Sequence, residues 1–234
     1  MSFELLKDLC NADSIASKEE EVRGILRNVW EEYSDEVFYD SLGSMIAKKK
    51  GADDNSLNIM FCAHMDEVGF EVRHISDIGF LYLIAIGGVQ DRSKHMQKVR
   101  VTTQSGKKIY GILNAVMDGA NIKDVYVDVG CETRAEVEAL GIQIGDMVTF
   151  ASEAFSMENE KIIAGKAMDD RSGCYVLSEA LKRLQSLNHK HNVYMALTSS
   201  EEVGVRGGKL VAHKVQPDIV FAIDVANHPE LDRG

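Results

Sequence analysis

The stretch NVYMALTSSEEVG, residues 192–204, carries the main clue to the fold. Its apolar run has the length and composition of a buried β-strand, and it ends in two adjacent glutamates, Glu201 and Glu202, before Val203-Gly204 turns the chain. Neighbouring carboxylates repel each other, and one of them would ordinarily be forced to hold a proton. Such a pair is tolerated on a solvated surface, or where a cation binds the acids. The remaining sequence helps to decide between these explanations.

Two further apolar runs end in the same way. LNIMFCA (57–63) leads into HMDE (64–67), and IVFAI (219–223) leads into Asp224. In open, mostly parallel α/β sheets, ligands bind outside the carboxyl ends of the strands. If the three strands are parallel neighbours, one imidazole and several carboxylates therefore meet at a single edge of the sheet.

A fourth motif, KAMDDRSG, adds Asp169 and Asp170 just before a predicted helix. Imidazole nitrogen and carboxylate oxygen together suit zinc, cobalt or manganese. A pair of metals about 3.5–4 Å apart needs a bridging carboxylate, and it turns the repulsion between the acids into attraction. On this interpretation one glutamate of the Glu201-Glu202 pair binds metal, and its neighbour is free to handle a proton.

Each motif alone also has a simpler explanation. A His-x-Asp at a strand end is common surface chemistry, Asp-Asp-Arg before a helix complements the helix dipole, and Glu-Glu at a turn is usually solvated. Asp224 is harder to dismiss, because an unpaired carboxylate in a buried apolar strand is costly. The specific signal is that all four motifs coincide at strand ends. The other histidines lack such a context.

The composition restricts the class of protein. The 234 residues can form one large domain or two smaller ones, and the net charge of −11 argues against a nucleic-acid partner. No apolar run approaches the ~20 residues of a membrane helix, and the amino terminus lacks the pattern of a secretion signal. The four cysteines have no paired spacing, which predicts buried free thiols in a reducing cytoplasm.

The order of the predicted elements indicates an α/β domain, residues 1–68 and 157–234, interrupted by a β-rich insert, residues 69–156. A Ser17/Glu20 capping-box pattern starts a first helix. Short alternating segments separated by turn residues fill the insert, with one short helix near 134–140. The other predicted elements are strands at 37–48 (broken by Gly43), 57–63, 192–199 and 218–225, and helices at 171–184 and 205–214.

The motifs HMDEVGF, GKAMDDRSG, SSEEVGVRGG and AIDVA, in that order, resemble the glutamyl aminopeptidase or tetrahedral (TET) aminopeptidase family of two-metal exopeptidases. The resemblance extends over essentially the whole chain, including DSLGSMIA near the start and GIQIGDMVTF in the insert. It implies a phosphorylase/hydrolase-like peptidase domain, with a mixed sheet flanked by helices. It also implies that the insert is a small PDZ-like β-barrel used for dimerisation.

The resemblance also implies a role for each polar residue of the motifs. His64 and Asp224 would bind the first metal, Asp169 would bridge the two metals, and Glu202 would bind the second. Glu201 would be the general base, Asp66 would fix the orientation of the imidazole, and Asp170 would cap or orient the following helix.

The activity implied is hydrolysis of amino-terminal residues from short peptides through a water activated by two divalent ions, zinc first, with cobalt or manganese as alternatives. Family members form dimers and tetrahedral dodecamers. They also continue beyond the point where this chain ends, and their last part supplies a histidine to the second metal, for which His228 is not a match. Two alternatives to the aminopeptidase stay open. The missing histidine favours a catalytically impaired assembly or binding module. Because fold does not fix substrate, a two-metal deacylase acting on a non-peptide amide is the other.

Overall fold

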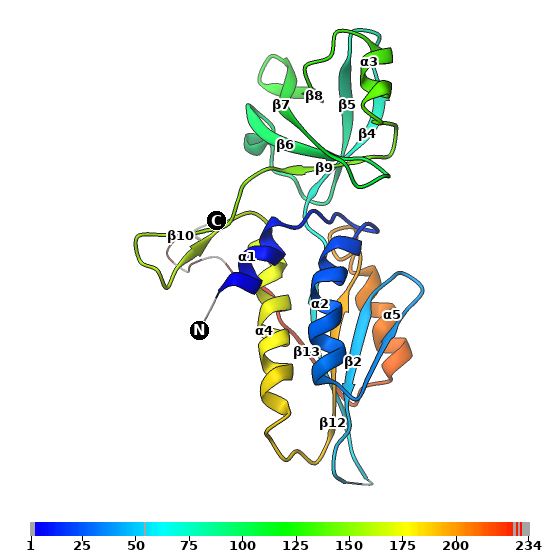
Figure 1. Ribbon diagram of the computed structural model, residues 1–234, viewed down its shortest axis with the longest axis vertical. Helices are drawn as coiled ribbons and strands as arrows, with labels where there is room; N and C mark the ends of the chain where they lie inside the picture. Colours follow the sequence, from blue (N-terminus) through cyan, green and yellow to red (C-terminus); the bar gives the residue numbers. More distant parts are fainter. Residues whose placement is uncertain (1–2, 54, 227, 229, 231–234) are drawn as a thin grey trace.

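The computed structural model describes residues 3–53, 55–226, 228 and 230. It consists of a five-stranded mixed sheet with helices on both faces and a closed six-stranded barrel that stands at one end of the sheet unit (Figure 1). The predicted α/β domain with a β-rich insert is therefore confirmed in outline. The PDZ-like character of the insert stays a prediction, as do the exact domain boundaries.

The sheet has the strand order β1-β2-β12-β3-β13. β1 (Glu36–Tyr39) and β2 (Met45–Lys49) form an antiparallel hairpin in place of the single interrupted strand predicted there. β12 (Asn192–Thr198) pairs antiparallel with β2 and parallel with β3 (Asn58–His64). β3 in turn pairs parallel with β13 (Ile219–Ala222). The three strands that lead into the polar motifs are thus parallel neighbours, and their carboxyl ends meet at one edge.

Helices cover both faces of this sheet. α1 (Glu4–Asn11), α2 (Glu20–Tyr33) and α4 (Met168–Leu184) pack on one face around Trp30, whose Nε1 donates a hydrogen bond to Ser178 Oγ at 2.8 Å. α5 (Arg206–Val215) buries Val211 and Val215 on the opposite face. The alternation of side chains along β12 supplies both cores, which is the pattern of a central strand.

The predicted Ser17/Glu20 capping box is wrong. α2 begins at Glu20 after Glu19, and no side chain caps its first turn. The Glu19 carboxylate instead reaches the turn after β12: its Oε1 accepts hydrogen bonds from Ser199 Oγ at 2.6 Å and from the backbone N–H of Ser200 at 3.0 Å. The helix start is therefore used to hold a distant turn, a tertiary contact that local spacing does not encode.

The barrel closes in the strand order β4-β5-β8-β7-β6-β9, and its interior is apolar. Its one helix, α3 (Arg134–Ala139), is capped by Thr133, whose hydroxyl accepts from the Glu136 N–H at 3.3 Å. A short hairpin of β10 (Phe155–Ser156) and β11 (Ile163–Ala164), with a 3-10 turn at Asp91–Ser93, completes the elements. The barrel strands are β4 (Gly69–Ile75), β5 (Phe80–Ile86), β6 (Gln97–Thr102), β7 (Lys108–Asp118), β8 (Asn121–Asp128) and β9 (Met147–Phe150).

The cysteines are all free thiols, as predicted, but only two of them are buried. Cys10 and Cys174 lie in the core, whereas Cys62 and Cys131 are partly exposed. Within the described residues, none of the helices combines the length and apolar composition that a membrane span requires.

Two adjacent glycines in α5 give opposite expectations for substitution by alanine. A Cβ at Gly207 would lie 2.7 Å from the backbone N of Ser199 and closer still to its carbonyl oxygen, whereas at Gly208 the nearest atom is Val205 Cγ1 at 3.4 Å. We expect Gly207→Ala to lower the free energy of unfolding by about 1–3 kcal/mol, because backbone must move. Gly208→Ala is the matched control, expected to be neutral or stabilising by up to about 1 kcal/mol. Urea unfolding of both variants measures this; equal effects would contradict the close contact.

The fully buried carboxylate of Asp13 lies between α1 and α2. We expect it to make the fold less stable in acid. Burial opposes its ionisation, but the hydrogen bond from Arg100 and the charge of Lys166 outweigh burial and hold the pKa of Asp13 well below its usual value of 3.8. A lowered pKa stabilises the fold at pH values above the unfolded pKa, and this contribution is lost progressively as the pH falls from the unfolded pKa to the lower folded pKa.

We therefore expect the free energy of unfolding to decrease as the pH falls below about 4, the pKa of an unfolded aspartate, and Asp13→Asn to remove part of this decrease. Urea unfolding at several pH values measures it. The same pH dependence in the variant and the wild type would show that other carboxylates dominate.

Candidate metal centre

His64, Asp169 and Asp224 come together at the carboxyl edge of the sheet. One ligand atom from each lies within 4.8 Å of the others, and this is the only group of three such residues found among those the structure describes. His64 is the last residue of β3, Asp169 lies in the first turn of α4, and Asp224 follows β13. Three segments far apart in sequence thus supply one nitrogen and two carboxylates.

The His64 imidazole is buried and held at both ring nitrogens. Nε2 lies 3.0 Å from Asp169 Oδ1, while Nδ1 lies 2.9 Å from the backbone oxygen of Asp66 and 3.5 Å from its Oδ1. Burial opposes protonation, but the hydrogen bonds to Asp169 and Asp66 outweigh it and raise the pKa of His64 to about 11. A divalent cation would compete with a proton for the ring nitrogen and the Asp169 carboxylate.

Asp66 connects the imidazole to the two glutamates. Its carboxylate is fully buried and accepts hydrogen bonds from the backbone N–H of Glu201 at 2.9 Å and of Glu202 at 3.0 Å. The same side chain therefore faces the His64 ring and fixes the turn that carries Glu201 and Glu202. From the sequence we expected only the first of these contacts.

Asp170 is buried directly behind the group. It accepts hydrogen bonds from the His64 N–H at 3.2 Å and from the Gly173 N–H at 3.0 Å, the second of which is a contact with the first turn of α4. Burial raises the pKa of Asp170 to about 7. The peptide bond that joins it to Asp169 is cis. Asp170 thus links the end of β3 to the start of α4, while Asp169 points outward with 59% of its side chain exposed.

Glu201 and Glu202 are half-buried beside this group and are not members of it. Burial, and then the negative charges of Asp169, Asp66 and Glu201, raise the pKa of Glu202 to about 7, although the charge of His64 opposes this. Glu202 packs against Gly87 of the barrel, where a Cβ would lie 2.9 Å from its Oε2. Gly87 has a φ of +78°. A glycine is required there for both reasons, and the sequence did not single it out.

A cleft of about 710 Å³ opens beside these acids. Asp169 and Glu202 line one side of the cleft, and the barrel segment with Gln90 and Arg92 lines another. The candidate site is therefore accessible to a molecule larger than an ion, and part of its wall belongs to the barrel.

The expectation that Asp224 is a buried carboxylate is wrong. β13 is the edge strand of the described sheet, its residues are exposed, and so is Asp224. Its Oδ1 accepts a hydrogen bond from the Val225 N–H at 2.7 Å. His228 is exposed and does not belong to the His64–Asp169–Asp224 group.

The donor set fits a divalent metal on chemical grounds. A neutral imidazole with two carboxylates is a common ligand set for zinc, and it also suits cobalt and manganese. Two of the three donors are exposed, which leaves room for a further ligand. All three residues are among the metal ligands expected from the sequence.

The chain belongs to the M42 glutamyl aminopeptidase family, whose model matches residues 43–231. It is 34% identical over 236 residues to the putative aminopeptidase FrvX of Escherichia coli (strain K12), an alignment that covers 97% of this chain and 65% of the relative. It spans about two thirds of the length of the curated relatives it matches.

Solved structures agree with this assignment. The TET aminopeptidase of the marine sediment archaeon Thaumarchaeota archaeon SCGC AB-539-E09 has a TM-score of 0.93 at 33% identity, covering 99% of this chain and 68% of that one. The TET1 peptidase of Pyrococcus horikoshii, which can assemble into a tetrahedron or a large octahedral shell, has a TM-score of 0.83 at 29% identity, covering 95% and 68%.

Proposed function

We propose that this protein is a two-metal aminopeptidase that removes amino-terminal residues from short peptides. The single observation that carries the proposal is the convergence of His64, Asp169 and Asp224 at the carboxyl edge of the sheet, in a member of an aminopeptidase family. The ordered motifs around these residues support the same assignment.

The metal ligands we propose are His64 and Asp224 for one ion, Asp169 as the bridge and Glu202 for the second ion. Zinc is the metal we expect, with cobalt or manganese as alternatives. Two such ions would polarise the scissile carbonyl and lower the pKa of a bound water towards ~7. The half-buried position of Glu202 beside Asp169 supports its assignment, because a cation would relieve the repulsion that raises its pKa.

Glu201 is the general base in this proposal. It takes a proton from the attacking water and passes it to the leaving amine. Its backbone N–H is fixed by Asp66, so the base is positioned by the same carboxylate that faces the His64 ring. Adjacent positions in one turn place Glu201 and Glu202 together at the edge of the cleft.

The relatives support the substrate class and the assembly that we propose. The cleft of about 710 Å³ suits a short peptide, and relatives are named glutamyl and lysyl aminopeptidases, so the preferred residue differs within the family. We also propose self-association into dimers, and into tetrahedral shells like those of related TET peptidases.

The test combines metal content with substrate choice. Elemental analysis of the dialysed chain is expected to give two divalent ions per chain. A panel of aminoacyl amides and matched N-acyl compounds then separates the reactions, and hydrolysis confined to substrates with a free amino terminus is expected. Turnover of the N-acyl compounds alone would indicate a deacylase. A chain that holds no metal and hydrolyses neither class of compound would indicate a binding or assembly module.

A further inference from the structure

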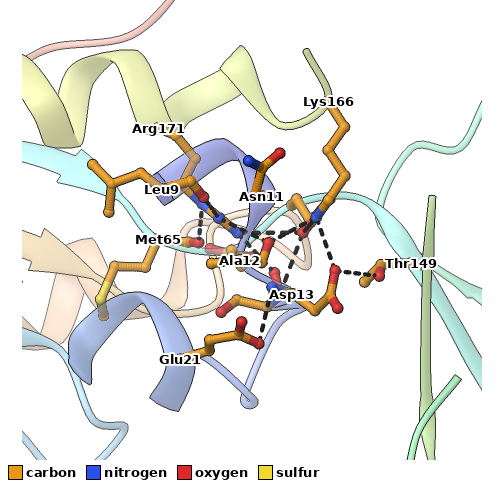
Figure 2. A network of polar contacts seen from close by, with 12 residues as sticks. Leu9, Asn11, Ala12, Asp13, Glu21, Met65, Thr149, Lys166 and Arg171 are labelled. Carbon is orange, nitrogen blue, oxygen red and sulfur yellow. Dashed lines mark hydrogen bonds and ion pairs between the residues drawn. The ribbon is translucent and has the colours of Figure 1, made fainter. Parts of the chain in front are cut away.

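A buried network of charges joins the barrel to both segments that lead into the candidate metal centre (Figure 2). Its central residue is Asp13, which is fully buried between α1 and α2. Arg100 on β6 donates a hydrogen bond to Asp13 Oδ1 at 2.5 Å, and Thr149 on β9 donates to the same oxygen at 2.7 Å. Lys108 on β7 lies 2.9 Å from Oδ2. Three barrel strands therefore converge on one carboxylate outside the barrel.

Lys166 continues the network towards the metal centre. Its Nζ lies 3.1 Å from Asp13 Oδ1, and it donates hydrogen bonds to the Ala12 carbonyl at 2.7 Å and to Glu67 Oε1 at 2.5 Å. Lys166 stands three residues before Asp169, and its side chain is almost fully buried. Burying an ammonium group is costly unless partners of opposite charge compensate it, and Asp13 and Glu67 are such partners here.

Glu67 completes the link on the other ligand-bearing segment. It directly follows Asp66, and its Oε1 accepts from Lys166 and, at 3.4 Å, from Arg171 of α4. Arg171 also donates to the carbonyl oxygens of Met65 at 2.8 Å and Leu9 at 2.6 Å. The segment after β3 and the segment before α4 are thus held to each other through one buried ion pair.

We propose that Asp13 is a positioning residue for the metal centre. Asp13 fixes the position of Lys166, and Lys166 in turn fixes that of Glu67. The positions of the metal ligands therefore depend on how the barrel packs against the rest of the chain. The proposal rests on the proposed metal centre. None of the network side chains belongs to the ligand group, so the effect acts through the backbone of residues 164–169 and 64–67. Groups that orient metal ligands typically contribute about 10–100-fold to metal affinity.

The alternative is that the network only stabilises the fold. A purely structural network would change the free energy of unfolding when Asp13 is altered, and it would leave the metal affinity of the folded chain unchanged. Metal affinity is therefore the measurement that separates the two roles, and it does not depend on turnover.

The experiment compares Zn²⁺ affinity in Asp13→Asn and Glu21→Gln, using the full chain and competition with a chromophoric chelator. Both variants remove one negative charge from the same network, because Glu21 binds Lys108 at 2.7 Å. Glu21 Oε2 also accepts a hydrogen bond from the Asp13 backbone N–H at 3.2 Å, and the amide oxygen of a glutamine can still accept that bond. The structure gives Glu21 no contact with Lys166 or Glu67, so Glu21→Gln is the matched control. We expect Asp13→Asn to weaken Zn²⁺ binding about tenfold and Glu21→Gln to leave it unchanged.

A second measurement uses the wild type, in case Asp13→Asn does not fold. By reciprocity, Zn²⁺ bound at the centre must stabilise the seating of the barrel. Hydrogen exchange is expected to slow on Zn²⁺ addition at residues 98–101 of β6, although they are not part of the ligand group. Unchanged exchange there, or equal Zn²⁺ affinity in the wild type and Asp13→Asn, would overturn this inference alone. A wild type with no measurable Zn²⁺ affinity would overturn the metal centre as well.

Discussion

Glu201→Gln is expected to lower kcat for aminoacyl amide hydrolysis by about 10²–10⁴-fold, the range that a general base contributes. Glutamine has nearly the same shape but cannot accept a proton from water at neutral pH. The backbone N–H of Glu201 would still bind Asp66, so the turn should keep its conformation. Steady-state kinetics together with metal content measures the effect, and the metal content is expected to stay at the wild-type value.

The matched control is Glu202→Gln, one residue further along the same turn. Its backbone N–H binds the other oxygen of Asp66, so neither substitution removes the hydrogen bonds that hold the turn. If Glu202 is a ligand, this variant loses metal as well as turnover. A Glu201→Gln variant that retains activity, or loses metal as Glu202→Gln does, would contradict the division of roles between the two acids.

The parts of the fold that follow local pattern were predictable from the sequence. The parallel β3, β12 and β13 were predicted because apolar runs of strand length ended in polar motifs, and the rule for parallel sheets placed those ends together. The same argument placed His64 and Asp224 at one edge of the sheet, and the KAMDDRSG motif before α4 added Asp169. In each case the information lies within a few residues of the end of a strand or the start of a helix.

The features that were missed depend on contacts between distant segments. The Glu19 carboxylate serves the Ser199–Ser200 turn instead of its own helix, and Asp13 binds three strands of the barrel. No local spacing marks either residue. The exposure of Asp224 was missed for a different reason: the apolar composition of β13 suggests burial, but exposure depends on the position of the strand in the sheet, and β13 lies at its edge.

Asp66→Asn is expected to reduce metal affinity by about 10–100-fold, the range found for residues that orient a metal ligand. Both carboxylate oxygens of Asp66 are already in use, one on the Glu201 N–H and one on the Glu202 N–H. An asparagine can accept only one of these bonds, and its amide group would bring a donor against the other N–H. Because the site is fully buried, the unpaired groups should also cost about 1–3 kcal/mol of stability.

This substitution separates two ways in which Asp66 could act. If Asp66 served only the His64 ring, Asp66→Asn would weaken metal binding and leave the turn with Glu201 and Glu202 unaffected. The backbone oxygen of Asp66, which lies 2.9 Å from Nδ1, is retained in this variant. If Asp66 also holds the turn, Asp66→Asn should slow catalysis beyond the loss explained by metal, since Glu201 and Glu202 both lose their anchor. Kinetics at saturating Zn²⁺ measure the difference. Full recovery of kcat under those conditions would limit Asp66 to the first role, whereas a persistent deficit would show that one buried carboxylate positions both the ligand and the base.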